Sequence, residues 1–185
     1  MDHTFYKLSS RGRADEGDAD TRSTAELEID EKLLWKTACG KRVVGWPKRV
    51  KLRLDQIRNL DDMLWTGGFY HVVSDRLRML LEEKAPNHTQ FLRVYPYFRG
   101  RAADVGPYWV ANWLFVVDCL DREATDWFST GEISIPAIRV SKIPRSKLVF
   151  RIEGAAEYTV AHARLKDLVT SSGLRGCQFY QINQK

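Results

Sequence analysis

The sequence predicts an α+β fold of mostly antiparallel strands with two or three helices, including two similar strand–helix–strand units. Three observations support this prediction. A chain of 185 residues is long enough to bury a core without disulfide bonds. Several segments alternate apolar and polar residues, as strands with one buried face do. Two further segments combine a strand, an amphipathic helix and a second strand, which is typical of a helix packed on a sheet.

The two similar units lie at about residues 69–95 and 157–182, and they align without a gap at an offset of 88 positions. Identical residues occupy many matched positions, among them Tyr70 and Tyr158, Leu77 and Leu165, and Gln90 and Gln178. The same offset aligns the RGRA sequences at 11–14 and 99–102, and residues 50–52 with 138–140. An internal duplication explains this match, and so does chance similarity of two amphipathic units.

We expect one domain over residues 1–185. A duplication would divide it into two lobes, of about residues 1–100 and 101–185, with a groove between them.

The first third of the chain predicts strands joined by loops. Residues 4–9 form the first expected strand, and the glycine- and aspartate-rich residues 10–25 predict a flexible loop. Residues 26–35 are compatible with either a strand or a short helix. Alternation predicts two more strands, at 42–46 and 49–55, separated by Pro47.

Each repeated unit shows where its helix begins and ends. In the first, the Ser74 hydroxyl can accept a hydrogen bond from a free amide of the first turn, and Pro86 with Asn87 ends the helix. In the second, His162 occupies the cap position, and Gly173 suits the left-handed conformation that follows many helices. Apolar residues at helical spacing predict the buried stripes, which comprise Leu77, Leu80 and Leu81, and Leu165, Leu168 and Val169.

Between the units lies the stretch 107–128, whose centre is rich in aromatic and β-branched residues and therefore favours a long buried strand. A helix would also place the apolar residues of this stretch on one face, so that alternative stays open. Further strands are expected at 133–144 and 147–154, which complete the α+β pattern.

Composition narrows the class of protein. The three cysteines (Cys39, Cys119 and Cys177) are an odd, widely spaced set that does not suggest disulfides or a zinc site. The first residues show no secretory signal pattern, and the longest apolar run, WLFVV, is too short to span a bilayer. We therefore expect a soluble cytoplasmic protein without a membrane partner.

No familiar catalytic pattern is present. The four histidines are far apart, and the sequence contains no glycine-rich phosphate loop, GxSxG or HExxH. The acidic cluster DCLDRE places Asp118, Asp121 and Glu123 at the end of the apolar stretch. Such carboxylates can hold a cation or act as acid and base, but they also cap turns at strand ends. We expect the turn or partner-contact role, no enzymatic activity, no metal and no cofactor.

The formal net charge of +5 is unevenly distributed. Residues 41–53 contain six bases and no acid, and residues 139–151 contain five bases and no acid. Such blocks can bind phosphates, so a nucleic-acid-binding module is the alternative function. The simpler interpretation is that these bases occupy the water-facing positions of strands.

Several motifs together resemble one protein family. They are the helix opening at Val73, Ser74 and Leu77 and the strand at Phe91 and Val94; the central stretch with Tyr108, Val117, Asp118, Leu120 and Asp121; and the closing Gly173, Leu174, Gly176 and Phe179. In order and spacing, they resemble the immunity proteins of bacterial polymorphic toxin systems. That family was formerly described as a domain of unknown function and has a myxobacterial type member. The resemblance covers about residues 63–182.

The resemblance implies an immunity protein that binds and neutralises a cognate toxin protein, with no catalytic residues to carry over. Tight binding usually depends on a few aromatic and arginine anchors. The segments 99–108 and 118–127 flank the tryptophan-rich strand, so we expect Arg101, Asp121, Arg122 and Trp127 at the contact surface. For Trp127, packing in the core is the alternative. The identity of the toxin and the oligomeric state stay open.

Overall fold

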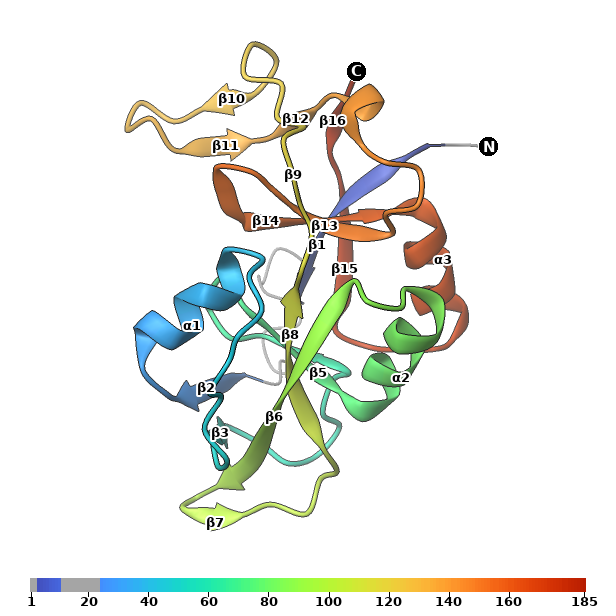
Figure 1. Cartoon of the computed structure of the whole chain (residues 1–185). Helices are drawn as coiled ribbons and strands as arrows, with labels where there is room; N and C mark the ends of the chain where they lie inside the picture. The colour runs from blue at the N-terminus through green and yellow to red at the C-terminus, as the bar shows by residue number, and fades with distance from the viewer. Residues whose placement is uncertain (1–2, 11–23) are drawn as a thin grey trace.

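A computed structural model describes residues 3–10 and 24–185 (Figure 1). Within these ranges it contains three helices, one short 3-10 helix and sixteen strands, which pair mostly antiparallel. The predicted α+β class is therefore confirmed. Most of the loop expected at 10–25, including the first RGRA sequence, lies outside the described residues.

The first sheet is built from residues between 25 and 113. Its strands lie in the order β2 (Ala25–Glu28), β3 (Lys51–Leu54), β6 (Thr89–Phe98), β8 (Tyr108–Trp113), β5 (His71–Ser74) and β4 (Met63–Leu64), and β7 (Arg101–Ala102) extends the end of β6. A parallel bridge between Thr24 and Trp65 brings the two ends of this order together. One face buries a cluster that includes Leu52, Val72 and Val110, with α1 (Glu31–Ala38) packed beside it.

The second sheet contains the C-terminal part of the chain and the first strand. Its order is β15 (Cys177–Gln181), β1 (Phe5–Ser10), β14 (Ala155–His162), β13 (Val149–Ile152) and β9 (Val116–Val117). Two separate two-stranded pairs belong to the same part of the chain: β12 (Ala137–Ile138) with β16 (Asn183–Gln184), and the hairpin of β10 (Asp126–Trp127) with β11 (Ile133–Ile135). A 3-10 helix, η1, spans Val140–Lys142.

Two helices connect the strands of the repeated units, α2 (Asp75–Lys84) and α3 (Ala163–Ser171). Figure 1 shows both on the same side of the molecule, and their apolar stripes share one core between the sheets, made from Leu77, Leu81, Leu165 and Val169 among others. Both predicted caps are confirmed. The Ser74 Oγ accepts from the Leu77 N–H at 3.3 Å, and the His162 Nδ1 accepts from the Arg164 N–H at 3.1 Å. None of the helices in the described ranges is long and apolar enough to cross a membrane.

The repeated units have the same connectivity and register. In the first, Val72 and Leu92 pair with Val110 from opposite sides, so β8 separates β5 from β6. In the second, Ala161 and Gln181 flank Tyr6 in the same way, so β1 separates β14 from β15. Residues twenty positions apart thus flank one central strand in both sheets. The central strand follows its unit in the first sheet and precedes it in the second.

The correspondence continues into neighbouring strands. The β4 residue Met63 pairs with Val73, and its counterpart Val149 pairs with Ala161. Even a side-chain contact is repeated: the Arg78 guanidinium lies over the Trp109 ring at 5.0 Å, and the Lys166 ammonium lies over the Tyr6 ring at 4.2 Å. These shared contacts are what a duplication would leave. The duplication itself remains our proposal.

One part of the sequence alignment is shifted. Lys51 pairs in parallel with Tyr95, and the residue that pairs in the same way with Asn183 is Ala137. A constant offset of 88 matches Lys51 to Arg139 instead. The two extra residues of the second half lie after these strands, because Met63 and Val73 are ten positions apart whereas Val149 and Ala161 are twelve positions apart.

Three predicted elements were wrong in detail. Residues 42–46 are not a strand but part of an irregular loop held by side chains. The long strand expected in the centre of 107–128 ends at Trp113, because there the chain leaves the first sheet and Phe115 begins to bond with β13 of the second. Residues 140–142 form the 3-10 helix rather than a strand. The ambiguous segment 26–35 is divided between β2 and α1.

Candidate partner-binding surface

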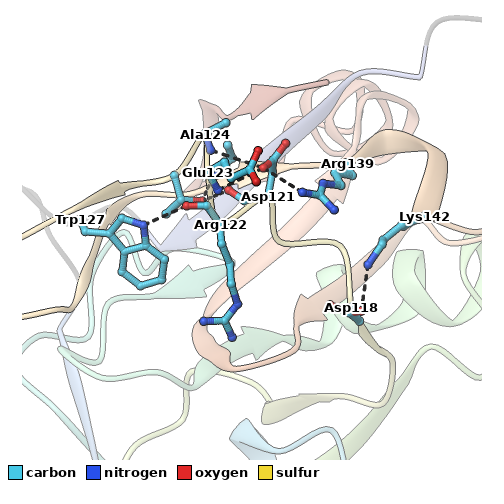
Figure 2. Close-up of polar contacts among 10 residues, drawn as sticks. Asp118, Asp121, Arg122, Glu123, Ala124, Trp127, Arg139 and Lys142 are labelled. Carbon is cyan, nitrogen blue, oxygen red and sulfur yellow. Dashed lines mark hydrogen bonds and ion pairs between the residues drawn. The ribbon is translucent and has the colours of Figure 1, made fainter.

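The structure separates the four residues expected at a contact surface. Arg101 lies on β7, at the end of the first sheet. Asp121 and Arg122 lie in the turn that leads into the β10–β11 hairpin, and Trp127 lies on β10 beside them, at the opposite end of the molecule (Figures 1 and 2). These four residues therefore do not form one patch, and the candidate surface described below contains two of them, with Asp121 holding the turn beneath it.

Asp121 is buried and holds the turn before the hairpin. Its Oδ1 accepts hydrogen bonds from the backbone N–H groups of Glu123 at 3.3 Å and Ala124 at 3.4 Å (Figure 2). The Arg139 guanidinium donates to the same oxygen at 3.3 Å. This bond is the main cause that keeps the pKa of Asp121 below its ordinary value, and the Ala124 amide contributes. A charged carboxylate with these partners is a turn cap.

The other acids of the DCLDRE cluster do not converge on Asp121. The Asp118 carboxylate forms an ion pair with the Lys142 ammonium at 3.0 Å, and Glu123 is exposed. Figure 2 shows Asp118 and Asp121 each facing a different base. Within residues 3–10 and 24–185, no three His, Cys, Asp or Glu side chains are grouped so that they could hold a metal ion.

The hairpin exposes apolar side chains. Trp127 is 41% exposed, Phe128 is 56% exposed and Ile135 is 47% exposed. The Trp127 indole N–H donates to the Arg122 carbonyl at 3.2 Å, which holds the ring beside the turn. Trp127 is thus at the surface rather than in the core. Exposed aromatic side chains next to an arginine are typical of protein-binding surfaces.

The hairpin is also fixed to the body of the protein. The Tyr158 hydroxyl of β14 donates to the Ile133 carbonyl at 2.9 Å. At the other end, the Thr125 hydroxyl donates to the Asp121 carbonyl at 2.7 Å and accepts from the Ala137 N–H at 3.1 Å. These bonds order the surface before any partner arrives, which lowers the entropy that binding would cost. We define the hairpin surface as Arg122, Trp127, Phe128 and Ile135.

Phe128 and Ile135 were not predicted as site residues. The alternation in the ISI sequence indicated a strand, but nothing local to the sequence shows that Ile133 packs against the core whereas Ile135 stays exposed. That information comes from the fold, in which the hairpin is a separate two-stranded pair.

Most bases of the second basic block, residues 139–151, contact other groups of the protein. In the second block, Arg139 pairs with Asp121, Lys142 pairs with Asp118, and the Lys147 ammonium lies over the Phe115 ring. Arg151 is fully buried and donates to the Phe69 carbonyl at 2.9 Å, and desolvation lowers its pKa to about 10. Most of this block is therefore engaged within the protein. This weakens the case for a nucleic-acid interface that uses both blocks.

The Asp121 turn makes a testable contribution to stability. We expect Asp121→Ala to lower the melting temperature by several degrees, because it leaves two backbone amides and a guanidinium without their acceptor. Asp118→Ala is the matched control, since it removes only an exposed ion pair, which contributes little. Thermal unfolding followed by circular dichroism measures both variants. Equal melting temperatures for the two would contradict the capping role.

Comparison with known proteins assigns the chain to a family. A search of curated proteins found no match. A family model described as an immunity protein family (Imm11) matches residues 4–184, which include both sheets and all three helices of the described chain. The match confirms the resemblance inferred from the motifs and extends it to the first third of the sequence. The chain belongs to the Imm11 family of immunity proteins.

Proposed function

We propose that this protein binds a cognate bacterial toxin in the cytoplasm and neutralises it stoichiometrically. The observation that carries the proposal is the family match over residues 4–184. The motifs of the sequence resemble those of immunity proteins from polymorphic toxin systems. Such a system requires a protein that protects the producing cell and its siblings. Binding in a fixed ratio is the simplest protection that needs no catalytic group.

We further propose that the hairpin surface contacts the toxin. Trp127 and Phe128 are large, exposed and held on an ordered hairpin, and Arg122 lies in the turn beside them. Tryptophan and arginine are the side chains that most often dominate binding free energy at protein interfaces. Arg101, at the other end of the molecule, would be a separate contact.

A stoichiometric mode agrees with the chemistry of the acidic cluster. A general acid needs a raised pKa, whereas Asp121 has a lowered pKa and its carboxylate is bonded to the turn. Asp118 is paired with Lys142 and points elsewhere. These contacts support a structural use of the carboxylates.

The test of neutralisation is co-expression with a toxin encoded beside this gene. Cells producing the toxin should survive only when this protein is present, and the two proteins should co-purify at a fixed ratio. Survival without a physical complex would contradict binding as the mechanism, since protection would then come from modification or destruction of something else.

The hairpin surface has its own test. Trp127→Ala combined with Phe128→Ala should weaken toxin binding by about ten- to hundredfold, because both rings would become buried in a desolvated contact. Trp35→Ala is the matched control, because Trp35 is also exposed but lies on α1. Calorimetric titration measures both affinities. An equal loss in the control, or no loss in the hairpin variant, would show that the hairpin is not the contact.

A further inference from the structure

The loop between α1 and β3 presents a concentrated positive charge. We define the basic loop as residues 41–50. Its four bases, Lys41, Arg42, Lys48 and Arg49, are all exposed, whereas Val43 and Val50 are buried beneath them. Val44 is 86% exposed and is followed by Gly45, whose φ of 77° allows the chain to turn there. The loop therefore exposes four bases and Val44 to solvent, while Val43 and Val50 hold it against the core.

Side chains of the first sheet hold this loop in one conformation. The Gln90 amide donates to the Val43 carbonyl at 3.0 Å and accepts from the Val43 N–H at 2.8 Å. Asn112, fully buried, donates to the Lys41 carbonyl at 2.8 Å. The Trp46 indole N–H donates to the Arg93 carbonyl at 2.8 Å. These bonds replace the ladder of a strand, so an irregular segment is ordered without being part of the sheet.

The bases of the loop form no ion pair with the residues that the structure describes, 3–10 and 24–185. The neighbouring strand β3 shows the contrast, since Lys51 pairs with Glu28 and Arg53 pairs with Glu26. Within the described part of the chain, none of the four loop bases has an ion pair, even though acidic residues occur on the adjacent β2. A fixed loop with four exposed bases, none of them paired with an acid of the described residues, is suited to an acidic surface.

We propose that the basic loop is a second docking surface, which binds an acidic patch of the toxin. This inference rests on the proposed function and adds the charge of the partner's surface. A protein is favoured over a nucleic acid because the one aromatic ring of the loop, Trp46, is partly buried against the core of the first sheet and bonded to the Arg93 carbonyl, so little of it is left for bases to stack on. The exposed Val44 side chain among the charges also suits a protein surface better than a phosphate backbone.

The repeated architecture supports a binding role for this part of the chain. In the first sheet, α1 and the basic loop lie between β2 and β3. In the second sheet, the β10–β11 hairpin lies between residue 120, which bridges to Ile138, and β12. The segment before β3 and the segment before β12 thus carry different insertions. The two strands themselves pair in the same parallel way, β3 with β6 and β12 with β16. Both proposed surfaces are therefore additions to the common framework.

The test replaces Lys41, Arg42, Lys48 and Arg49 together by glutamine and titrates the purified variant with the toxin that wild-type protein binds. We expect affinity at least about tenfold weaker at low salt, and a smaller dependence of affinity on salt concentration. The control is Lys51→Gln with Arg53→Gln, which removes two bases that are already paired. The control should keep the wild-type affinity and salt dependence.

The outcomes are distinguishable. If wild-type protein does not bind the toxin at all, the proposed function fails. If wild-type protein binds but the quadruple variant binds equally well with the same salt dependence, only this inference is overturned. If wild-type protein retains RNA or DNA in competition with the toxin, and the quadruple variant loses that retention, the loop is a nucleic-acid surface and the inference is also overturned.

A second variant tests the ordering of the loop while keeping its charge. Gln90→Ala removes the two bonds to Val43 but leaves all four bases. We expect weaker toxin binding with the wild-type salt dependence, because the charges remain but a loosened loop must now be fixed on binding. Wild-type affinity in this variant would contradict the requirement for a preformed loop.

Discussion

Gly176→Ala is expected to destabilise the fold by about 3 kcal/mol or more, because the added Cβ would meet the backbone of another segment. Gly176 has a φ of 84°, a conformation that side chains rarely adopt. An added Cβ would lie 2.3 Å from the Met63 carbonyl oxygen and 2.6 Å from the Asp61 Cβ. Both neighbours belong to the segment that enters β4, so neither can move without disturbing the first sheet.

This position matters because it joins the two sheets. The Arg175 carbonyl accepts from the N–H of Met63 at 3.1 Å, and the Arg175 N–H donates to the Asp62 carboxylate at 3.0 Å. The segment between α3 and β15 is thereby bonded to the start of β4. A side chain at Gly176 would push these two segments apart.

Gly173→Ala is the control for backbone strain alone. Gly173 also has a positive φ, of 62°, but nothing lies within 4 Å of an added Cβ. This variant should lose only about 1–2 kcal/mol. Chemical denaturation of both variants measures the difference. Equal losses would mean that a small shift relieves the close approach to Met63 and Asp61, and that steric exclusion is not what requires glycine at position 176.

The same contacts explain a motif that the sequence could only match by resemblance. In the closing Gly173, Leu174, Gly176 and Phe179, the first glycine ends a helix and the second makes space for another segment. The helix-ending role was predictable, because it depends on residues next to it in the chain. The second role depends on Met63, more than a hundred positions away.

This difference between local and distant causes separates what the sequence predicts from what only the fold reveals. Both helix caps follow from a few neighbouring residues, because Ser74 and His162 bond to amides two or three positions along. The break after Trp113 was not predicted, because it reflects the transfer of the chain to a second sheet. Alternation at 42–46 predicts a strand that does not form, since this segment is ordered by Gln90 and not by a neighbouring strand.

The candidate surfaces also show that contacts between neighbours in the chain were predictable and contacts between distant segments were not. Asp121, Arg122 and Trp127 were predicted together and do meet in space, because they lie within seven positions of one another. Arg101 was predicted beside them, although β8 places the two segments at opposite ends of the molecule (Figure 1). The bases of 139–151 look available in the sequence, whereas acids on the preceding segment neutralise two of them. Pairing across the fold decides what each surface presents.

The second large effect concerns pH. His71 is buried between the sheets, and burial with the nearby Arg151 guanidinium lowers its pKa to about 3. Its Nδ1 accepts a hydrogen bond from the Trp113 indole N–H at 2.9 Å, so the neutral ring is the form that fits. In the unfolded chain the pKa returns to about 6.5. Between these two values the unfolded state binds a proton that the folded state does not.

Stability from the neutral His71 is therefore complete above pH 6.5 and is lost as the pH falls toward 3. At pH 4.5 the expected loss from this group is about 2–3 kcal/mol relative to pH 7. His71→Gln is the decisive variant, because glutamine can still accept the Trp113 N–H but does not titrate. Urea denaturation at pH 7 and pH 4.5 compares the two proteins, and losses from carboxylates common to both cancel. Wild-type protein should lose about 2–3 kcal/mol more than the variant. Parallel losses in the two proteins would show that His71 becomes protonated in the folded state, and the neutral buried ring would have to be abandoned.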